Sequence, residues 1–339
     1  MTAILAATLS VAQDEAPPAA PAKPRPALIA PLAQSSILLG LAQAGQRLVA
    51  VGQRGHILLS DDGKQWRQVA VPANAMLNRV RFRDDKTGWA VGHDATILGT
   101  TDGGQTWTLQ HFSGGGRALY DVIFLDDRHL VAIGGYGSYF ASADGKTWEA
   151  RSFPVTELGQ HLNAAIRLAD GTLLLAGERG LLARSKDGGE TWALLASPYT
   201  GSFFGVLPAG AKGALVYGLR GNIYVADDAG ACPTMEPADY DPFTRETVTD
   251  PAALATLGWR HVAAPTTEGL FGGAADGAGA VLVGVNGVLL RVDPAQDRAA
   301  MIAAPARETL NDILRHDERW LAVGRRGVQD LGPLTGAQP

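Results

Sequence analysis

Short apolar runs alternate with polar turns along almost the whole chain, and one unit of this pattern recurs seven times. In each copy an apolar strand ends in Gly, two turn residues follow, and a second small residue opens another strand. The first copy covers residues 51–55, and its first Gly recurs after 40, 42, 43, 41, 66 and 40 residues. A period near 40 with several short strands per unit is typical of a propeller blade, which buries its faces by stacking on its neighbours. The pattern predicts an all-β, seven-bladed β-propeller with four-stranded antiparallel blades.

The second unit shows the four predicted strands most clearly, at 78–82, 87–91, 96–100 and 107–112. Between the third and fourth strands lies a Ser/Thr-x-Asp-Gly turn that ends in Trp, and four units carry it. The carboxylate and hydroxyl can accept hydrogen bonds from turn amides, Gly supplies a positive φ, and the large Trp ring can pack between blades. We call these the Asp-Gly turns; their predicted structural residues are Asp62 and Trp66, Asp102 and Trp107, Asp144 and Trp148, and Asp187 and Trp192.

The last unit ends early, because only a short tail follows Val328. Residues 27–31 match the fourth-strand segments 68–72 and 301–305 in their pattern of apolar residues and Pro. We therefore expect an N-terminal strand to complete the last blade, which would close the ring and remove an exposed edge.

Outside the repeats, the composition of the chain predicts four further segments. Residues 1–13 resemble an export signal, although no Lys or Arg precedes the apolar stretch, which leaves open a start further upstream. Residues 14–26 form a Pro/Ala linker, residues 27–333 the propeller, and residues 334–339 a tail. The 66-residue interval contains an insertion at 230–257 in blade five, which we interpret as a solvated surface loop. Export predicts a periplasmic protein.

Charge and the scarcity of metal ligands narrow the function. The net charge is −5 and no run of Lys or Arg occurs, which argues against a nucleic-acid partner, because binding to phosphates needs a basic face. There is a single Cys, and the seven His residues occur singly, without the spacings that zinc sites use. We therefore predict no metal and no cofactor.

The Asp-Gly turns resemble the Asp-box of the bacterial neuraminidase repeat. Together with the seven Gly turns, they make the chain similar to the photosystem II assembly and stability factor family, which has relatives in non-photosynthetic bacteria. The resemblance implies a seven-bladed propeller that acts as an assembly scaffold rather than an enzyme and carries an arginine patch on one face. Sialidases share the Asp-box, and Tyr120 or Tyr136 is the available nucleophile. The early Phe/Tyr-Arg-Ile-Pro motif of sialidases is absent, so we do not expect catalysis.

The residue just before the second small residue of the Gly turn is Arg in four of the seven units, although the chain holds only 29 Lys and Arg in 339 residues. Arg groups around one face can clamp carboxylates or phosphates. Duplication of an ancestral turn that merely tolerated Arg is the alternative. Loops that join blades on the same face add aromatic candidates. The predicted partner-binding residues are Arg54, Arg179, Arg220, Arg325, Arg326, Tyr136, Tyr120, His161 and Phe203.

These observations predict a non-catalytic, monomeric periplasmic scaffold that lies peripheral to the membrane. Its expected partner is a membrane protein or envelope complex, and the resemblance suggests a transporter. A carbohydrate- or anion-binding propeller, or more remotely a sialidase-like glycosidase, is the alternative function.

Overall fold

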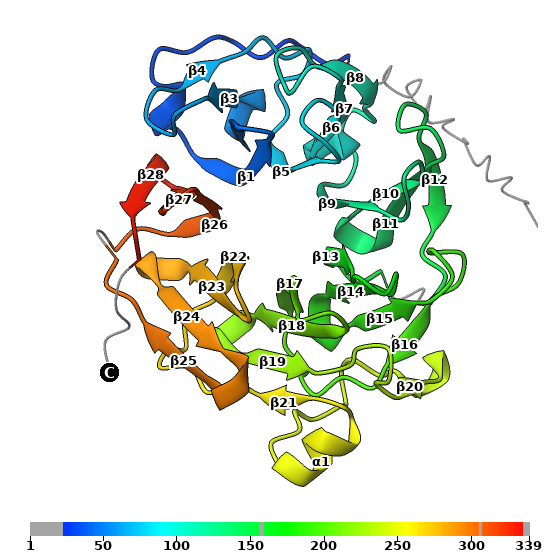
Figure 1. Cartoon of the computed structure of the whole chain (residues 1–339). Coiled ribbons are helices and arrows are strands. Elements are labelled where there is room, and N and C mark those ends of the chain that lie inside the picture. The colour runs from blue at the N-terminus through cyan, green and yellow to red at the C-terminus, as the bar shows by residue number, and fades with distance from the viewer. Residues whose placement is uncertain (1–22, 156–158, 305–306, 335–339) are drawn as a thin grey trace, which may run out of the picture.

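The computed structural model describes residues 23–155, 159–304 and 307–334. The predicted export signal, most of the linker and most of the tail lie outside these residues. Within them the strands form seven antiparallel sheets arranged around a common axis (Figure 1). The prediction of an all-β, seven-bladed propeller is confirmed.

Each blade begins with the strand nearest the axis and ends at the rim (Figure 1). Blade one contains β1 (Leu38–Ala44), β2 (Arg47–Gly52), β3 (Ile57–Ser60) and β4 (Arg67–Gln68), and blade two contains β5 (Leu77–Phe82), β6 (Gly88–Gly92), β7 (Ile97–Thr100) and β8 (Thr108–His111). Blade three contains β9 (Leu119–Phe124), β10 (Leu130–Gly134), β11 (Ser138–Ser142) and β12 (Glu149–Ser152), and blade four contains β13 (Leu162–Arg167), β14 (Leu173–Gly177), β15 (Leu182–Ser185) and β16 (Ala193–Leu195). Blade five contains β17 (Phe203–Ala209), β18 (Gly213–Gly218), β19 (Ile223–Ala226) and β21 (Arg260–His261), blade six contains β22 (Leu270–Asp276), β23 (Gly279–Gly284), β24 (Leu289–Asp293) and β25 (Arg298–Met301), and blade seven contains β26 (Leu310–His316), β27 (Arg319–Gly324) and β28 (Gly327–Gly332).

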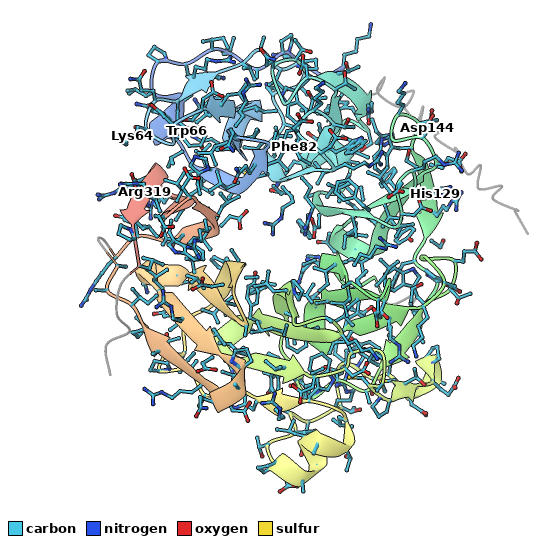
Figure 2. The ribbon with its side chains drawn as sticks, in the orientation of Figure 1. Lys64, Trp66, Phe82, His129, Asp144 and Arg319 are labelled. Atoms are coloured by element: carbon cyan, nitrogen blue, oxygen red, sulfur yellow. The ribbon has the colours of Figure 1, made fainter. Side chains whose placement is uncertain are left out.

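The core lies between the blades. Each of the seven seams between neighbouring blades holds one apolar cluster of the described residues. The Trp of each Asp-Gly turn packs into the seam with the preceding blade: Trp107 joins the cluster of blades one and two, and Trp148 that of blades two and three. Trp66, which Figure 2 labels in blade one, packs against the cluster of blades seven and one. Because burial of apolar surface drives folding, no blade is stable without its neighbours.

The Asp-Gly turns are held by their own side chains. In blade one, Asp62 Oδ1 accepts hydrogen bonds from the amides of Lys64 and Gln65, both at 2.8 Å, and Ser60 Oγ accepts one from the amide of Gly63 at 2.9 Å. These bonds lower the pKa of the Asp62 carboxyl, because they favour its charged form. The turn therefore satisfies these backbone donors with its own side chains.

Blade seven contains three strands, so the expected N-terminal strand in this blade is wrong. Residues 27–31 are not a strand, and they lie along the rim of blade one. The amide of Ala27 donates to the carbonyl of Val71 at 2.9 Å, and Gln68 Nε2 donates to the carbonyl of Leu28 at 2.9 Å. A short 3-10 helix, Ala33–Ser35, then contacts β28, with Ala33 buried in the seam of blades seven and one. The N-terminal segment therefore packs across this seam instead of adding a strand to blade seven. A strand-like sequence pattern does not distinguish these two arrangements.

The insertion at 230–257 lies between β19 and β21 and is docked against blade four, which differs from the solvated loop expected. Its strand β20 (Thr234–Met235) pairs with β16 and becomes the fifth strand of blade four. A 3-10 helix (Pro237–Asp239) and the helix α1 (Pro251–Thr256) follow. Arg184 Nη1 donates to the carbonyls of Ala229, Gly230 and Cys232 at 3.0, 2.9 and 2.8 Å. Blade four therefore anchors the start of the insertion.

Candidate functional site

The Gly turns between the second and third strands all lie on one face of the ring, which we call the turn face. In blade one the amide of Gln53 donates to the carbonyl of Ile37, the residue just before β1, at 3.0 Å. A Cβ added at Gly52 would lie 2.2 Å from that oxygen, which explains why the strand must end in Gly. All seven blades make the equivalent hydrogen bond, so the sequence repeat places seven similar turns around the axis.

The central residue of the turn is left-handed in six blades, with φ between 54° and 57°. Non-Gly residues rarely adopt this conformation, which costs about 1–2 kcal/mol for an L-residue, although Asn and Asp tolerate it. The side chains that occupy it are Arg54, Asp94, Tyr136, Arg179, Arg220 and Asn286. Three Arg and one Tyr therefore stand where Gly or Asn would fit better, and strained residues of this kind concentrate at functional sites. This strain favours a role for the side chains over simple tolerance.

Blade seven has a shorter connection, in which Arg325 and Arg326 link the paired residues Gly324 and Gly327. Arg54, Arg220, Arg325 and Arg326 are all exposed. Arg326 pairs with Glu308 at 2.9 Å, whereas Arg54, Arg220 and Arg325 form no ion pair with any residue in the described ranges. Within the described part of the chain, the turn face thus presents three guanidinium groups without an ion-pair partner.

An aromatic cluster lies on the turn face between blades three and four. We define the Tyr136 cluster as Arg117, Tyr120, Tyr136, His161 and Glu178. The His161 ring lies 4.8 Å from the ring of Tyr136 and 5.7 Å from that of Tyr120. Arg117 covers Tyr136 at 5.4 Å and donates to its carbonyl at 2.8 Å, and Glu178 accepts from the His161 amide at 3.2 Å. Tyr136 is 60% exposed, so its ring is available to a partner.

The insertion extends this cluster. The ring of Phe243, which is 74% exposed, lies 4.4 Å from the guanidinium of Arg179, and Tyr240 Oη donates to the Arg179 carbonyl at 3.2 Å. Arg179 also lies 3.7 Å from Glu178. Sequence reasoning missed Phe243 and Arg117, because neither residue occupies a repeated position. Their only signal was an aromatic or basic residue in a loop next to the turn face.

The prediction that Phe203 binds a partner is wrong. Phe203 is fully buried in the seam of blades four and five, where its ring lies 6.2 Å from that of Tyr224 at an interplanar angle of 89°. The first residue of each inner strand is a buried apolar side chain, so Phe203 occupies a core position and cannot reach a partner on the surface. Tyr120 and His161 are half-buried, and the ring of Tyr136 packs against that of His161.

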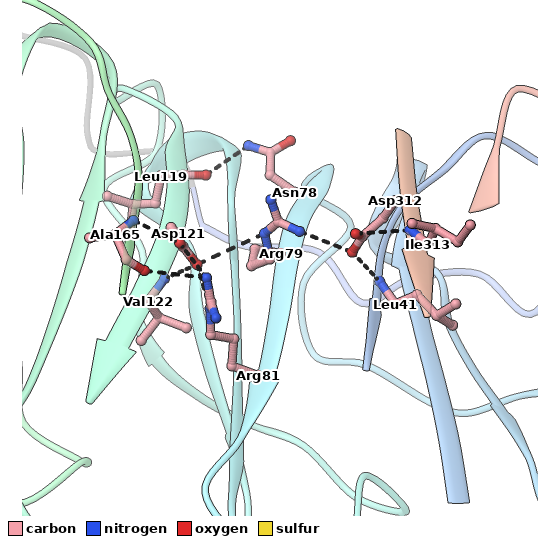
Figure 3. A network of polar contacts seen from close by, with 10 residues as sticks. All are labelled: Leu41, Asn78, Arg79, Arg81, Leu119, Asp121, Val122, Ala165, Asp312 and Ile313. Atoms are coloured by element: carbon pink, nitrogen blue, oxygen red, sulfur yellow. Dashed lines mark hydrogen bonds and ion pairs between the residues drawn. The ribbon is translucent and has the colours of Figure 1, made fainter. Parts of the chain in front are cut away.

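The inner strands carry a polar network that sequence reasoning also missed (Figure 3). Asp312 of blade seven accepts hydrogen bonds from Arg79 Nη1 at 2.9 Å and from the amide of Leu41 at 3.0 Å, so it joins blade seven to blades one and two. Burial raises the pKa of Asp312 despite the attraction of Arg79. Burial also lowers the pKa of Arg79, but Asp312 and Asp121 raise it by more. The two charges therefore depend on each other.

Asp121 of blade three repeats this arrangement. It accepts two hydrogen bonds from Arg81, at 2.7 and 2.6 Å, and one from the amide of Ala165 in blade four at 3.2 Å (Figure 3). Arg79 Nε lies 3.9 Å from the same carboxylate. The charges of the two Arg and two Asp residues cancel. Because their contacts join strands of different blades, the network connects the blades.

Asn residues at the second position of three inner strands also connect neighbouring blades. The side-chain amides of Asn78, Asn163 and Asn311 donate to the carbonyl of the first inner-strand residue of the next blade, at 2.7, 2.7 and 2.9 Å. These three Asn residues share one repeat position, so an alignment of the units would have found them.

The comparisons with known proteins agree with this architecture. The model of a family described as photosynthesis system II assembly factor YCF48 matches residues 58–117 and 113–236, which is more than half of the chain. The chain belongs to this family.

Curated relatives support the assignment to the YCF48 family. A photosystem II assembly protein of Synechococcus sp. is 25% identical over 185 residues, covering 53% of this chain and 54% of that protein. A chloroplast photosystem II stability/assembly factor of Cyanidioschyzon merolae is 31% identical over 90 residues, covering 26% of this chain and 20% of that protein. The matches thus span about half of these relatives or less.

Solved structures share the fold. A structure titled as YCF48 bound to D1 peptide is 18% identical with a TM-score of 0.65, covering 93% of this chain and 99% of that one. Virginiamycin B lyase from Staphylococcus aureus is 11% identical with a TM-score of 0.66, covering 91% of this chain and 99% of that one. The second match shows that the same fold also occurs in an enzyme. In the part of the chain that the structure describes, no helix is long and apolar enough to cross a membrane.

Proposed function

We propose that this YCF48 family member is a non-catalytic periplasmic scaffold that binds a segment of a membrane protein or envelope complex through its turn face. The observation that carries the proposal is the set of unpaired guanidinium groups of Arg54, Arg220 and Arg325. Because Arg54 and Arg220 occupy strained left-handed positions, their side chains are costly to the fold and are best explained by a partner with carboxylates. The relative titled as bound to D1 peptide supports a membrane-protein partner.

The aromatic groups fit the same proposal. Exposed Tyr136 and Phe243 flank Arg179, and aromatic residues beside Arg are typical of the centres of protein interfaces. A transporter is the client that the family resemblance suggests, and a protein peripheral to the membrane could reach its periplasmic loops.

The alternative is a carbohydrate- or anion-binding module, or a sialidase-like hydrolase. A Tyr nucleophile needs a lowered pKa or an adjacent base. Burial raises the pKa of Tyr120, and the nearby Tyr136 and Glu178 raise it further. This direction favours the neutral phenol and supports the non-catalytic scaffold.

The test compares recovery of cross-linked membrane proteins by the wild type and by an Arg54→Asn/Arg220→Asn variant, because Asn tolerates the left-handed conformation. The matched control is Arg128→Asn/Lys146→Asn, which removes the same charge from exposed loops outside the turn face. We expect the turn-face variant to recover at least 10-fold less of one specific membrane protein than the wild type does, and the control to recover the wild-type amount. Equal recovery by both variants, together with a rise in melting temperature on adding a sugar acid, would favour the alternative.

A further inference from the structure

The outer edge of blade three lacks the cover that blade four has. Strand β12 (Glu149–Ser152) pairs only with β11 and lies at the end of its sheet. All four of its residues are exposed. In blade four the corresponding strand, β16, is covered by β20 from the insertion. Among the described residues, no strand pairs with the outer amides and carbonyls of β12, so another strand can pair with them.

A groove runs along this open edge. It has a volume of about 940 Å³. Residues 150–155 line it consecutively. Residues 150–152 belong to β12, and residues 136–140 belong to the Gly turn and β11, so the groove extends over the two outer strands of blade three and reaches the edge strand. The four residues of β12 span about 13 Å, enough for a short added strand.

The walls of the groove are apolar and connect with the turn face. Tyr139, Phe153 and Val155 are buried beside it, and Pro237 and Tyr240 of the insertion form the opposite side. At one end lie Tyr136 and Arg117 of the Tyr136 cluster. The groove is therefore continuous with the proposed binding face, and the described lining residues hold Arg117 and Arg151 but no carboxylate.

We propose that β12 is a docking edge for an extended segment of the protein partner, which adds as a fifth strand to blade three as β20 does in blade four. The segment carries alternating apolar side chains for the groove and an acidic residue at the end near Arg117 and Tyr136. This inference rests on the proposed function, because it specifies the form in which the partner segment binds. Backbone pairing supplies affinity, and the pocketed side chains supply specificity.

Two edge variants test the proposal with a phage-displayed library of random ten-residue peptides selected on the wild-type protein. In an antiparallel strand, adjacent residues direct their N–H groups to opposite sides. Of the two variants Ala150→Pro and Arg151→Pro, one therefore removes an N–H group on the outer side of β12. That variant is recognised because it keeps the wild-type melting temperature. The control for each is Gly at the same position, which retains the N–H group. We expect selected peptides to alternate apolar residues after an acidic one, and to bind the folded Pro variant at least 10-fold more weakly than its Gly control.

Hydrogen exchange on the wild type provides a second measurement, independent of how the variants fold. Bound peptide should protect the amides of residues 149–152. Failure to select any peptide, equal binding to the Pro and Gly variants, or protection confined to the Gly turns would overturn the docking edge. If the Arg54→Asn/Arg220→Asn variant still loses its membrane partner in that case, the proposed function stands and only this inference fails.

Discussion

At the scale of single residues, the two kinds of turn use polar side chains differently. In the Asp-Gly turns, carboxylates accept hydrogen bonds from backbone amides and stabilise the turn. In the Gly turns, Arg54, Arg220 and Tyr136 hold a left-handed conformation that an L-residue adopts only at a cost. The first set serves the fold, and the second is explained by what it presents to solvent.

The Asp-Gly turns predict a specific loss of stability in acid. The pKa of Asp187 falls to about 2 through hydrogen bonds from the Thr191 side chain and amide, and that of Asp144 falls to about 2 through the amides of Thr147 and Lys146. A depressed pKa in the folded state means that the unfolded state binds more protons, so the contribution is complete above 3.8 and is lost as the pH falls towards 2. Between pH 4 and 2 we expect the melting temperature of Asp144→Asn/Asp187→Asn to fall less steeply than that of the wild type.

The control for this experiment is Asp127→Asn. Asp127 is exposed and accepts no hydrogen bond from a described residue. Its variant should follow the wild-type curve. Parallel curves for the wild type and the double variant would contradict the assignment of the acid transition to the Asp-Gly turns.

At the scale of elements, the insertion is the segment that most changes the surface. It completes blade four with β20, carries Phe243 to the turn face, and forms one wall of the groove beside β12. These positions depend on how the insertion is tied to blade four, where Arg184 holds three of its carbonyls.

Arg184→Met should release the start of the insertion. Burial raises the pKa of Cys232 to about 11, so the native thiol should be unreactive at neutral pH. Each lost hydrogen bond to a charged donor lowers the free energy of unfolding by up to about 1.5–3 kcal/mol. We expect the variant to melt at a lower temperature and to expose Cys232, measured as labelling by a thiol reagent at least 10 times faster than in the wild type. Unchanged labelling with a normal melting temperature would show that Leu254 and β20 hold the insertion without Arg184.

At the scale of the whole molecule, the ring is closed by polar contacts and packing at the seam of blades seven and one. Asp312 and Asn311 of blade seven bond to blade one, and the N-terminal segment covers the same seam. A three-stranded last blade is sufficient because its faces remain covered by blades six and one.

Asp312→Ala should therefore destabilise the entire ring by about 3–5 kcal/mol, because it removes the hydrogen-bonded partner of the largely buried Arg79 guanidinium and leaves only the Asp121 carboxylate, 3.9 Å away. The double variant Asp312→Leu/Arg79→Met should recover part of this loss. Asp330→Ala, which removes a surface partner of Arg319 in the same blade, should cost only about 1 kcal/mol or less. Chemical denaturation measures all three, and equal losses for Asp312→Ala and Asp330→Ala would disprove the role of the network in ring closure.

Much of this protein follows from local sequence, because repeated local rules generate the fold. Each Gly that ends a strand is demanded by a nearby carbonyl, and each turn Trp fills the seam with the preceding blade, so recognising the repeat predicts seven blades and a single turn face with Arg54 and Arg220 on it. Other features depend on contacts between segments that the local pattern does not relate. The contact of Phe243 with Arg179, the bond of Asp312 to Arg79, the burial of Phe203 and the placement of residues 27–31 on blade one arise only when these segments pack together. Local pattern specifies which surfaces a strand must bury, whereas the folded ring decides which neighbour buries them.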